Sequence, residues 1–210
     1  SLDGVDCYQL NVFEKSPLAK YIANGKLPAA ADTAQKADMF AKSVEVLTAH
    51  QWHRLSNNHW RQTNRERNIY NELGKSACDC LAFGCGAGGR LKGYGFMMNR
   101  SLADWSAGVD AGLKPVMVMT APGPNWALLR TVSSDMESGA INLPCISERF
   151  GVDVDALTRE VTSQWEEAGL VTRTGDWLVQ TVAGQFWHVT LAQLLVDLIG
   201  KALRKEALAA

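Results

Sequence analysis

The chain has 210 residues, of which 47% are hydrophobic, enough for a sizeable core in one large or two small domains. Its net charge of −1 argues against nucleic acid or an anionic membrane as the main partner. No segment approaches the roughly 18 apolar residues of a membrane span, and the N-terminus lacks the pattern of a signal peptide, so we expect a cytoplasmic protein.

The first fifty residues predict one strand followed by two helices. Residues 5–13 alternate in polarity, which is typical of a strand. A short helical piece follows Pro17. Asp32 resembles a helix N-cap with Gln35 as its capping-box partner, and apolar residues then recur at helical spacing as far as about His50.

Two further strands and a polar loop are expected next. Residues 52–60 predict a strand that would place His53 and His59 on one side. Residues 61–76 are dense in arginine and predict a loop, and residues 78–83 predict the third strand. This order of strands and helices indicates an α/β protein, with too few βα units to close a barrel alone.

Residues 81–96 are the most unusual stretch, because six of these sixteen residues are glycine. Glycine within strands is usually kept where the backbone turns at positive φ or lies against a ligand. If a strand precedes the glycines, they follow its C-terminal end, which faces the ligand in α/β folds. A tight hairpin between two buried strands explains the composition equally well. A phosphate loop is disfavoured, because neither of its glycine patterns is present.

The remainder of the chain predicts mainly helices. Short helices are expected around residues 102–111 and 126–133. Apolar residues at helical spacing then predict a helix that stops at Gly151 and another over residues 153–169. Thr174 and Gly175 follow as the centre of a hairpin, and the order helix, helix, hairpin indicates a winged helix.

The winged helix is not expected to bind DNA. The helix in the recognition position carries five acidic residues against one base, Arg159, and would repel phosphate. The last predicted helix, residues 182–203, is apolar on more than one face. We therefore expect it to pack across the preceding part of the chain or to form a homodimer.

The motif DCLAFGCGAGG at residues 79–89, the pair Arg67-Asn68 upstream of it and the winged-helix tail with RFG and EEAGLV resemble one known family. It is the oxygen-independent coproporphyrinogen III oxidase (HemN-like) family of radical S-adenosylmethionine (SAM) proteins. The spellings RERNIYN, SNNHW and AFGCGAGG look most like its anaerobic haem-utilisation branch, the HutW-like proteins similar to anaerobilin synthase. This resemblance covers nearly the whole chain.

The resemblance implies the C-terminal part of a partial triose-phosphate-isomerase-like radical SAM barrel, at whose mouth a [4Fe-4S] cluster cleaves SAM to a radical. The cluster motif of the family, C-x3-C-x2-C, is missing here, since Cys78, Cys80 and Cys85 read C-x-C-x4-C. Cys78 and Cys80 are better interpreted as a pair of buried structural thiols. We therefore expect a fragment of a longer enzyme that alone binds no metal or cofactor and has no activity.

The same resemblance implies contacts with a second SAM molecule. The positions concerned are Asn11, Ile69, Tyr70, Gly86, Ala87 and Gly88. Chemically this is reasonable, because glycines let a backbone approach a nucleoside closely and a tyrosine ring can stack on adenine.

Contacts with the substrate are expected from His59, Arg65, Arg67 and Asn68. Arg61, Arg65 and Arg67 could bind the two propionates of a tetrapyrrole, because guanidinium pairs bidentately with carboxylate. Solvated surface arginines explain these residues equally well. Ligation of haem iron by His53 or His59 stays open beside the commoner role of a histidine hydrogen-bonded within the fold.

The predicted organisation is therefore the end of a radical SAM barrel with its glycine-rich segment over residues 1–121, and a HemN-type winged-helix domain with a terminal helix over residues 122–210. The expected activity of the whole protein is anaerobic haem degradation, by opening of the porphyrin ring and release of iron. Decarboxylation of coproporphyrinogen III and non-catalytic haem binding or delivery are the alternatives. An unidentified electron donor is an expected partner of the enzyme.

Overall fold

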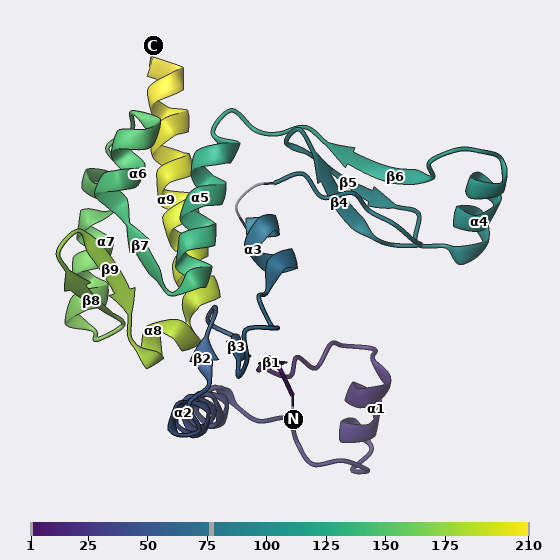
Figure 1. Ribbon diagram of the computed structural model, residues 1–210, viewed down its shortest axis with the longest axis horizontal. Helices are drawn as coiled ribbons and strands as arrows, with labels where there is room; N and C mark the ends of the chain where they lie inside the picture. The colour runs from purple at the N-terminus through teal and green to yellow at the C-terminus, as the bar shows by residue number, and fades with distance from the viewer. Residues whose placement is uncertain (1, 76–77, 210) are drawn as a thin grey trace.

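Three separate three-stranded sheets and the helices around them form the computed structural model, which describes residues 2–75 and 78–209 (Figure 1). The predicted class, a mixture of α and β, is confirmed. Every strand pairing in these described ranges is antiparallel. The segments expected to be barrel strands therefore enter the fold as short antiparallel strands.

The first sheet contains β1 (Gly4–Asp6), β3 (His59–Arg61) and β2 (His53–Arg54), in that order. The predicted strand over residues 5–13 is thus wrong beyond Asp6. The predicted strand over residues 52–60 is a hairpin instead, because the backbone turns so that the N–H groups of Leu55 and Ser56 both donate to the His59 carbonyl.

The helices of the first half follow their local signals. Helix α1 (Pro17–Ala23) begins after the Ser16 cap, and α2 (Thr33–Ala49) begins with the predicted capping box of Asp32 and Gln35. Helix α3 (Ile69–Lys75) lies within the segment predicted to be a loop.

The second sheet holds most of the glycine-rich stretch and has the order β4 (Gly88–Leu91), β5 (Tyr94–Met98), β6 (Val116–Thr120). Helix α4 (Leu102–Asp110) connects β5 to β6, and Figure 1 shows this sheet and helix extending away from the other elements. The hairpin alternative is therefore the one that the structure shows.

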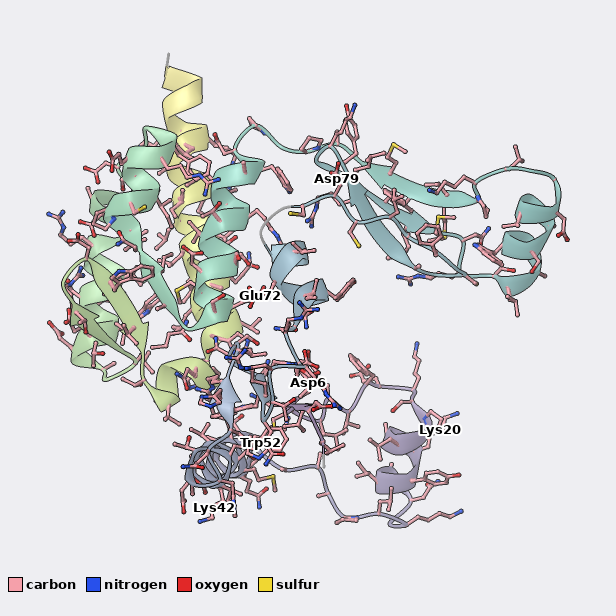
Figure 2. All side chains as sticks on the ribbon, in the orientation of Figure 1. Asp6, Lys20, Lys42, Trp52, Glu72 and Asp79 are labelled. Atoms are coloured by element: carbon pink, nitrogen blue, oxygen red, sulfur yellow. The ribbon has the colours of Figure 1, made fainter. Side chains whose placement is uncertain are left out.

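The predicted strand over residues 78–83 does not form, and its residues instead contact the β4–β5 hairpin. Lys92 and Gly93 both have positive φ, 49° and 82°, as the tight turn of a two-residue hairpin requires. Asp79, labelled in Figure 2, accepts a hydrogen bond from the Lys92 N–H at 2.6 Å. Of the predicted strand, only Cys80 pairs with the sheet, through an isolated bridge to Arg90.

The last 85 or so residues form a helical unit around the third sheet, whose order is β7 (Ala140–Asn142), β9 (Trp177–Gln180), β8 (Val171–Thr174). Its helices are α5 (Trp126–Ser138), α6 (Leu143–Phe150), α7 (Val154–Glu167), α8 (Val182–Phe186) and α9 (His188–Ala209). The predicted order helix, helix, hairpin is confirmed, as is the helix end at Gly151, whose φ is +65°.

The predicted last helix, residues 182–203, is in fact two helices that meet at Trp187. Helix α9 packs beside α5 and α7, within its own unit rather than across the barrel-like half of the chain (Figure 1). Its buried residues are Leu191, Ala192, Leu195, Ile199 and Leu203. Part of the broad apolar surface seen in the sequence therefore fills the core of the C-terminal unit. Phe186 of α8 packs against Phe40 of α2, whereas Val189, Leu194 and Leu198 stay exposed.

Polar contacts join the β2–β3 hairpin to this helical unit. The Asn57 side chain is buried and donates to the Met136 carbonyl at 3.0 Å and to Gln180 Oε1 at 3.1 Å. Arg54 donates to Gln185 and stacks on the Trp60 ring at 4.5 Å, and burial lowers the pKa of its guanidinium to about 10. The hairpin is thereby fixed to β9 and α5.

No helix in the described ranges is both long enough and apolar enough to cross a membrane.

Candidate functional site

A cleft of about 760 Å³ lies between α3, one face of the β4–β5–β6 sheet and α5. Tyr70 and Asn71 contribute from α3, and Arg130 and Glu137 contribute from α5. The sheet supplies glycine, arginine and methionine side by side. We refer to this space as the arginine cleft.

The sheet leaves open space in the floor of the arginine cleft at two residues that have no side chain. Gly88 and Gly95 line it, and a Cβ atom built on Gly95 meets nothing within 4 Å, while one on Gly88 meets only a carbonyl oxygen at 4.0 Å. Neither glycine has positive φ. A turn therefore does not require glycine at these positions, whereas close approach of a flat group to the sheet does.

Gly89 differs from these two glycines because it is needed for packing. A Cβ atom there would lie 2.6 Å from the Phe96 ring, 2.7 Å from the Cys80 carbonyl oxygen and 2.9 Å from the Ala82 nitrogen. Alternate residues of a strand point to opposite faces, so Gly88 faces the cleft and Gly89 faces the packed side.

Two guanidinium groups in the cleft share one backbone acceptor. Arg130 donates to the Gly74 carbonyl at 2.6 Å, and Arg90 donates to the same oxygen at 3.4 Å. Arg130 Nε is buried without a hydrogen-bond partner. Burial and the nearby charge of Arg90 lower the pKa of Arg130, and the opposing effect of Glu137 is smaller.

Arg90 is also held by the helix that follows the sheet. Its guanidinium lies 5.4 Å from the centre of the Trp126 ring, at the start of α5. Arg100 lines the cleft from the end of β5, is exposed and donates to Met97 Sδ at 3.2 Å. The sheet side of the cleft therefore carries two cations, Arg90 and Arg100, while α5 contributes Arg130 together with the carboxylate of Glu137.

Of the six positions predicted to contact SAM, the structure brings two together in this cleft. Tyr70 lies on α3 with 74% of its surface exposed, and Gly88 lies on the floor. Ile69 precedes Tyr70 on the helix and is exposed. Gly86 and Ala87 lie in the turn before β4 and are not among the lining residues.

The sixth position, Asn11, lies apart from the cleft. It is exposed in the irregular segment after β1, where the sequence pattern predicted a strand. It is also absent from the lining residues of the arginine cleft. Its predicted role in binding SAM stays a prediction.

The four predicted substrate residues are also outside the cleft lining. Arg65 and Arg67 are exposed. His59 is buried, with Nδ1 2.6 Å from Asp6 Oδ1 and Nε2 3.3 Å from Glu66 Oε1 (Asp6 is labelled in Figure 2). Asp6 thus holds this ring through Nδ1, while Nε2 lies near Glu66 without a hydrogen bond. The burial of the ring and its bond to Asp6 favour the role within the fold over iron ligation.

Asn68, the fourth of these residues, serves to start helix α3. Its φ is +52°, its N–H donates to Glu66 Oε1 at 2.6 Å and its side-chain oxygen accepts from Asn71 at 2.7 Å. Asn68 itself is buried. It positions Tyr70 and Asn71, two residues that do line the cleft.

The cysteines do not fit an iron–sulfur cluster. In the ranges that the structure describes, no three of the side chains of His, Cys, Asp or Glu come together as a metal site. Cys78 is exposed, so the interpretation of Cys78 and Cys80 as a pair of buried thiols is wrong for Cys78. The reason is that residues 78–83 do not form the predicted strand, and Cys80 alone joins the sheet.

Sequence reasoning missed the arginines that line the cleft. Arg90 stands inside the glycine-rich stretch, but Arg100 and Arg130 lie 10 and 40 residues further along the chain. A signal was available for Arg90, since in a β4–β5 hairpin it shares a face with Gly88. No local pattern marks Arg130, because α5 packs beside α3 only in the tertiary fold.

Comparisons with known proteins show which proteins this chain resembles. No family model matches the sequence. Anaerobilin synthase of Escherichia coli O157:H7 is 36% identical over 199 residues, which cover 94% of this chain and 43% of that protein. The structure of coproporphyrinogen III oxidase (HemN) from Escherichia coli, described as a radical SAM enzyme, matches with a TM-score of 0.62 at 14% identity, over 79% of this chain and 42% of that one. This chain therefore spans less than half the length of both proteins.

Proposed function

We propose that this chain, which resembles HemN-like proteins in sequence and in fold, is part of a radical SAM enzyme that acts on a tetrapyrrole. The observation that carries the proposal is the arginine cleft. It combines two glycines that leave space at the sheet, an exposed tyrosine ring and guanidinium groups, which suit a planar ligand that carries carboxylates.

Within this class, we favour anaerobic haem degradation with opening of the ring and release of iron. Support comes from the 36% identity with anaerobilin synthase, which extends over nearly the whole of this chain. Oxidative decarboxylation of coproporphyrinogen III is the second candidate, and the structural match to HemN favours it. Non-catalytic haem binding or delivery is the third, because a cleft that binds a tetrapyrrole serves it equally well.

The described residues would bind ligands rather than generate the reactive species. In the whole enzyme, SAM and an iron–sulfur cluster supply the radical chemistry, and the cysteines described above do not fit that cluster. Tyr70 would stack on a flat ring, and Gly88 would let that ring approach the sheet. We therefore propose that this chain alone neither binds the cluster nor turns over a substrate.

The chain divides naturally into a barrel-like and glycine-rich part, residues 1–121, and a winged-helix-type part, residues 122–210. The three-stranded sheet and the α6–α7 pair of the second part support this division. A homodimer through α9 is supported by its exposed apolar residues Val189, Leu194 and Leu198. A cytoplasmic location and an electron donor complete the proposal.

An anaerobic product assay on the full-length, cluster-loaded protein tests the proposed function. Haem and coproporphyrinogen III are each supplied with SAM and a reductant, and the products are identified by mass spectrometry. A ring-opened tetrapyrrole with free iron supports haem degradation. Loss of carbon dioxide from coproporphyrinogen supports the second candidate. Haem binding without any product supports the third, and neither binding nor turnover overturns the proposal.

A further inference from the structure

The Gly74 carbonyl at the end of α3 accepts hydrogen bonds from two cations at once. Arg130 approaches from α5 at 2.6 Å and Arg90 approaches from β4 at 3.4 Å. A neutral carbonyl offsets little of the repulsion between two guanidinium groups, and the carboxylate of Glu137, which also lines the cleft, has a smaller effect on Arg130 than Arg90 has. An anionic carboxylate bound between the two arginines would form stronger, charge-assisted bonds with both. The arrangement is thus better suited to an anion than to the oxygen it now holds.

The surroundings of these two arginines point in the same direction. Arg130 Nε is buried without a partner, and both side chains line the open cleft. The Trp126 ring holds Arg90 at 5.4 Å, which limits its freedom to turn out to solvent. A planar guanidinium fixed in this way presents N–H donors whose arrangement matches the two oxygens of a carboxylate.

We propose that Arg90 and Arg130 form a carboxylate-binding site at the wall of the arginine cleft. The inference rests on the proposed function and stands beside the role predicted for Arg65 and Arg67, which are exposed and do not line the cleft. The carboxylate can come from two sources, a propionate of the tetrapyrrole or the amino-acid part of SAM. Burial of Arg130 and repulsion by Arg90 both lower the pKa of Arg130. A bound carboxylate would offset both effects.

The first arm of the test needs no substitution. Haem and haem dimethyl ester are titrated into the full-length protein, and binding is followed by absorbance. If a propionate occupies the site, the ester binds at least about tenfold more weakly, since a hydrogen bond to a charged group is typically worth a factor of about ten or more. If wild-type protein binds neither haem nor coproporphyrinogen III, the proposed function fails and this inference fails with it.

The second arm uses Arg90→Met, Arg130→Met and the double variant, with Arg159→Gln as a matched control. Arg159 is an exposed arginine on α7 that pairs with Asp155 within its own helix and does not line the cleft. Each cleft variant should weaken binding of free haem about tenfold or more and remove the preference over the ester. Arg159→Gln should leave both affinities unchanged.

A third arm identifies the source of the carboxylate and protects against trivial unfolding. SAM is titrated into the same variants, and their melting temperatures are measured. A loss of SAM affinity with unchanged haem affinity assigns the site to the amino-acid carboxylate and supports it as a carboxylate site. Two outcomes overturn the inference. One is a folded double variant whose affinities for haem and SAM are both unchanged. The other is wild-type protein that binds haem and its ester equally, together with variants that lose no SAM affinity.

Discussion

The helical unit from Trp126 to Ala209 and the chain before it differ in how they bury apolar surface. Every residue of the main core cluster lies between Leu128 and Leu203. In the described residues before Trp126, the buried hydrophobic side chains are Phe40, Trp60, Ala82 and Met98. The same part exposes large apolar side chains, among them Tyr8, Leu10, Phe13, Phe83 and Met119.

The two regions therefore differ in role: the helical unit contains the main core, and the chain before it forms most of the cleft. The helical unit forms one core of its own, in which α5 and α9 pack side by side with the third sheet (Figure 1). The first part supplies the glycine floor and α3 of the arginine cleft, while the helical unit supplies only its wall, α5. The well-packed unit therefore serves as a support for a less buried segment that forms most of the cleft.

The largest expected effect contrasts a core residue with an exposed one. Leu195 on α9 is 0% exposed, and Leu195→Ala should lower the free energy of unfolding by roughly 2–5 kcal/mol, because it removes buried contacts and leaves a cavity. Met119 on β6 is 64% exposed, and Met119→Ala should change that free energy by no more than about 0.5 kcal/mol. Urea unfolding followed by circular dichroism measures both. Equal losses would contradict the contrast between the two regions.

The next effect separates two neighbouring glycines of the sheet. Gly89→Ala should destabilise the protein by roughly 1–3 kcal/mol, since its Cβ would lie under 3 Å from two backbone atoms. Gly88→Ala should be nearly neutral for stability, because its nearest neighbour is 4.0 Å away. Thermal unfolding compares the two variants.

Gly88→Val extends the same comparison to function. The larger side chain should occupy the floor of the cleft and reduce tetrapyrrole binding, while the melting temperature changes little. If the melting temperature collapses while the folded fraction binds normally, Gly88 is structural and its assignment to the site is wrong.

The two regions also differ in how far the sequence predicted them. Local signals determined the helical unit: Gly151 adopts the positive φ of a helix end, and Thr174 and Gly175 lie at the predicted hairpin. These signals work because a helix end and a hairpin turn depend on residues that are adjacent in the chain. The break at Trp187 was missed, since apolar residues continue on both sides of it.

In the first part, similar patterns failed where tertiary contacts decide the structure. Residues 52–60 alternate like a strand, but Asn57 turns into the helical unit to bond Met136 and Gln180. For the site, the resemblance to a family led to Tyr70 and Gly88. Arg130 could not be found in this way, because it meets the Gly74 carbonyl across 56 residues of sequence.

A smaller effect is expected at the junction of the two regions. Asn57→Ala should cost about 1–2 kcal/mol, because it removes two buried hydrogen bonds and leaves Gln180 Oε1 without its donor. The first part should loosen more than the helical unit. Hydrogen exchange should then accelerate in β2 and β3 while the core amides of α9 stay protected. Equal acceleration in both regions would show that they unfold as one.

The smallest effect concerns Asp135, a half-buried carboxylate near the C-terminal end of α5. Burial raises its pKa, and the opposing attraction of Arg149 is weaker. A carboxylate whose pKa is raised by folding stabilises the fold at low pH, and this stabilisation is lost as the pH rises through the folded-state pKa. At neutral pH, the ionised group therefore opposes folding, and its charge also opposes the helix dipole.

Asp135→Asn should accordingly stabilise the protein at pH 7 by roughly a few tenths of a kcal/mol, the range of most substitutions away from the core. The gain should shrink as the pH falls through the raised folded-state pKa of Asp135 and should be gone below the usual carboxyl value of 3.8, because the wild-type side chain is then protonated and equally neutral. Melting temperatures of both proteins across this pH range measure the difference. A gain that is independent of pH would arise from packing. A loss at pH 7 would mean that the attraction between Asp135 and Arg149 outweighs the cost of burying the charge of Asp135.

Because α5 is also the wall of the cleft, unchanged haem affinity in this variant would show that the support can be stabilised without altering the site.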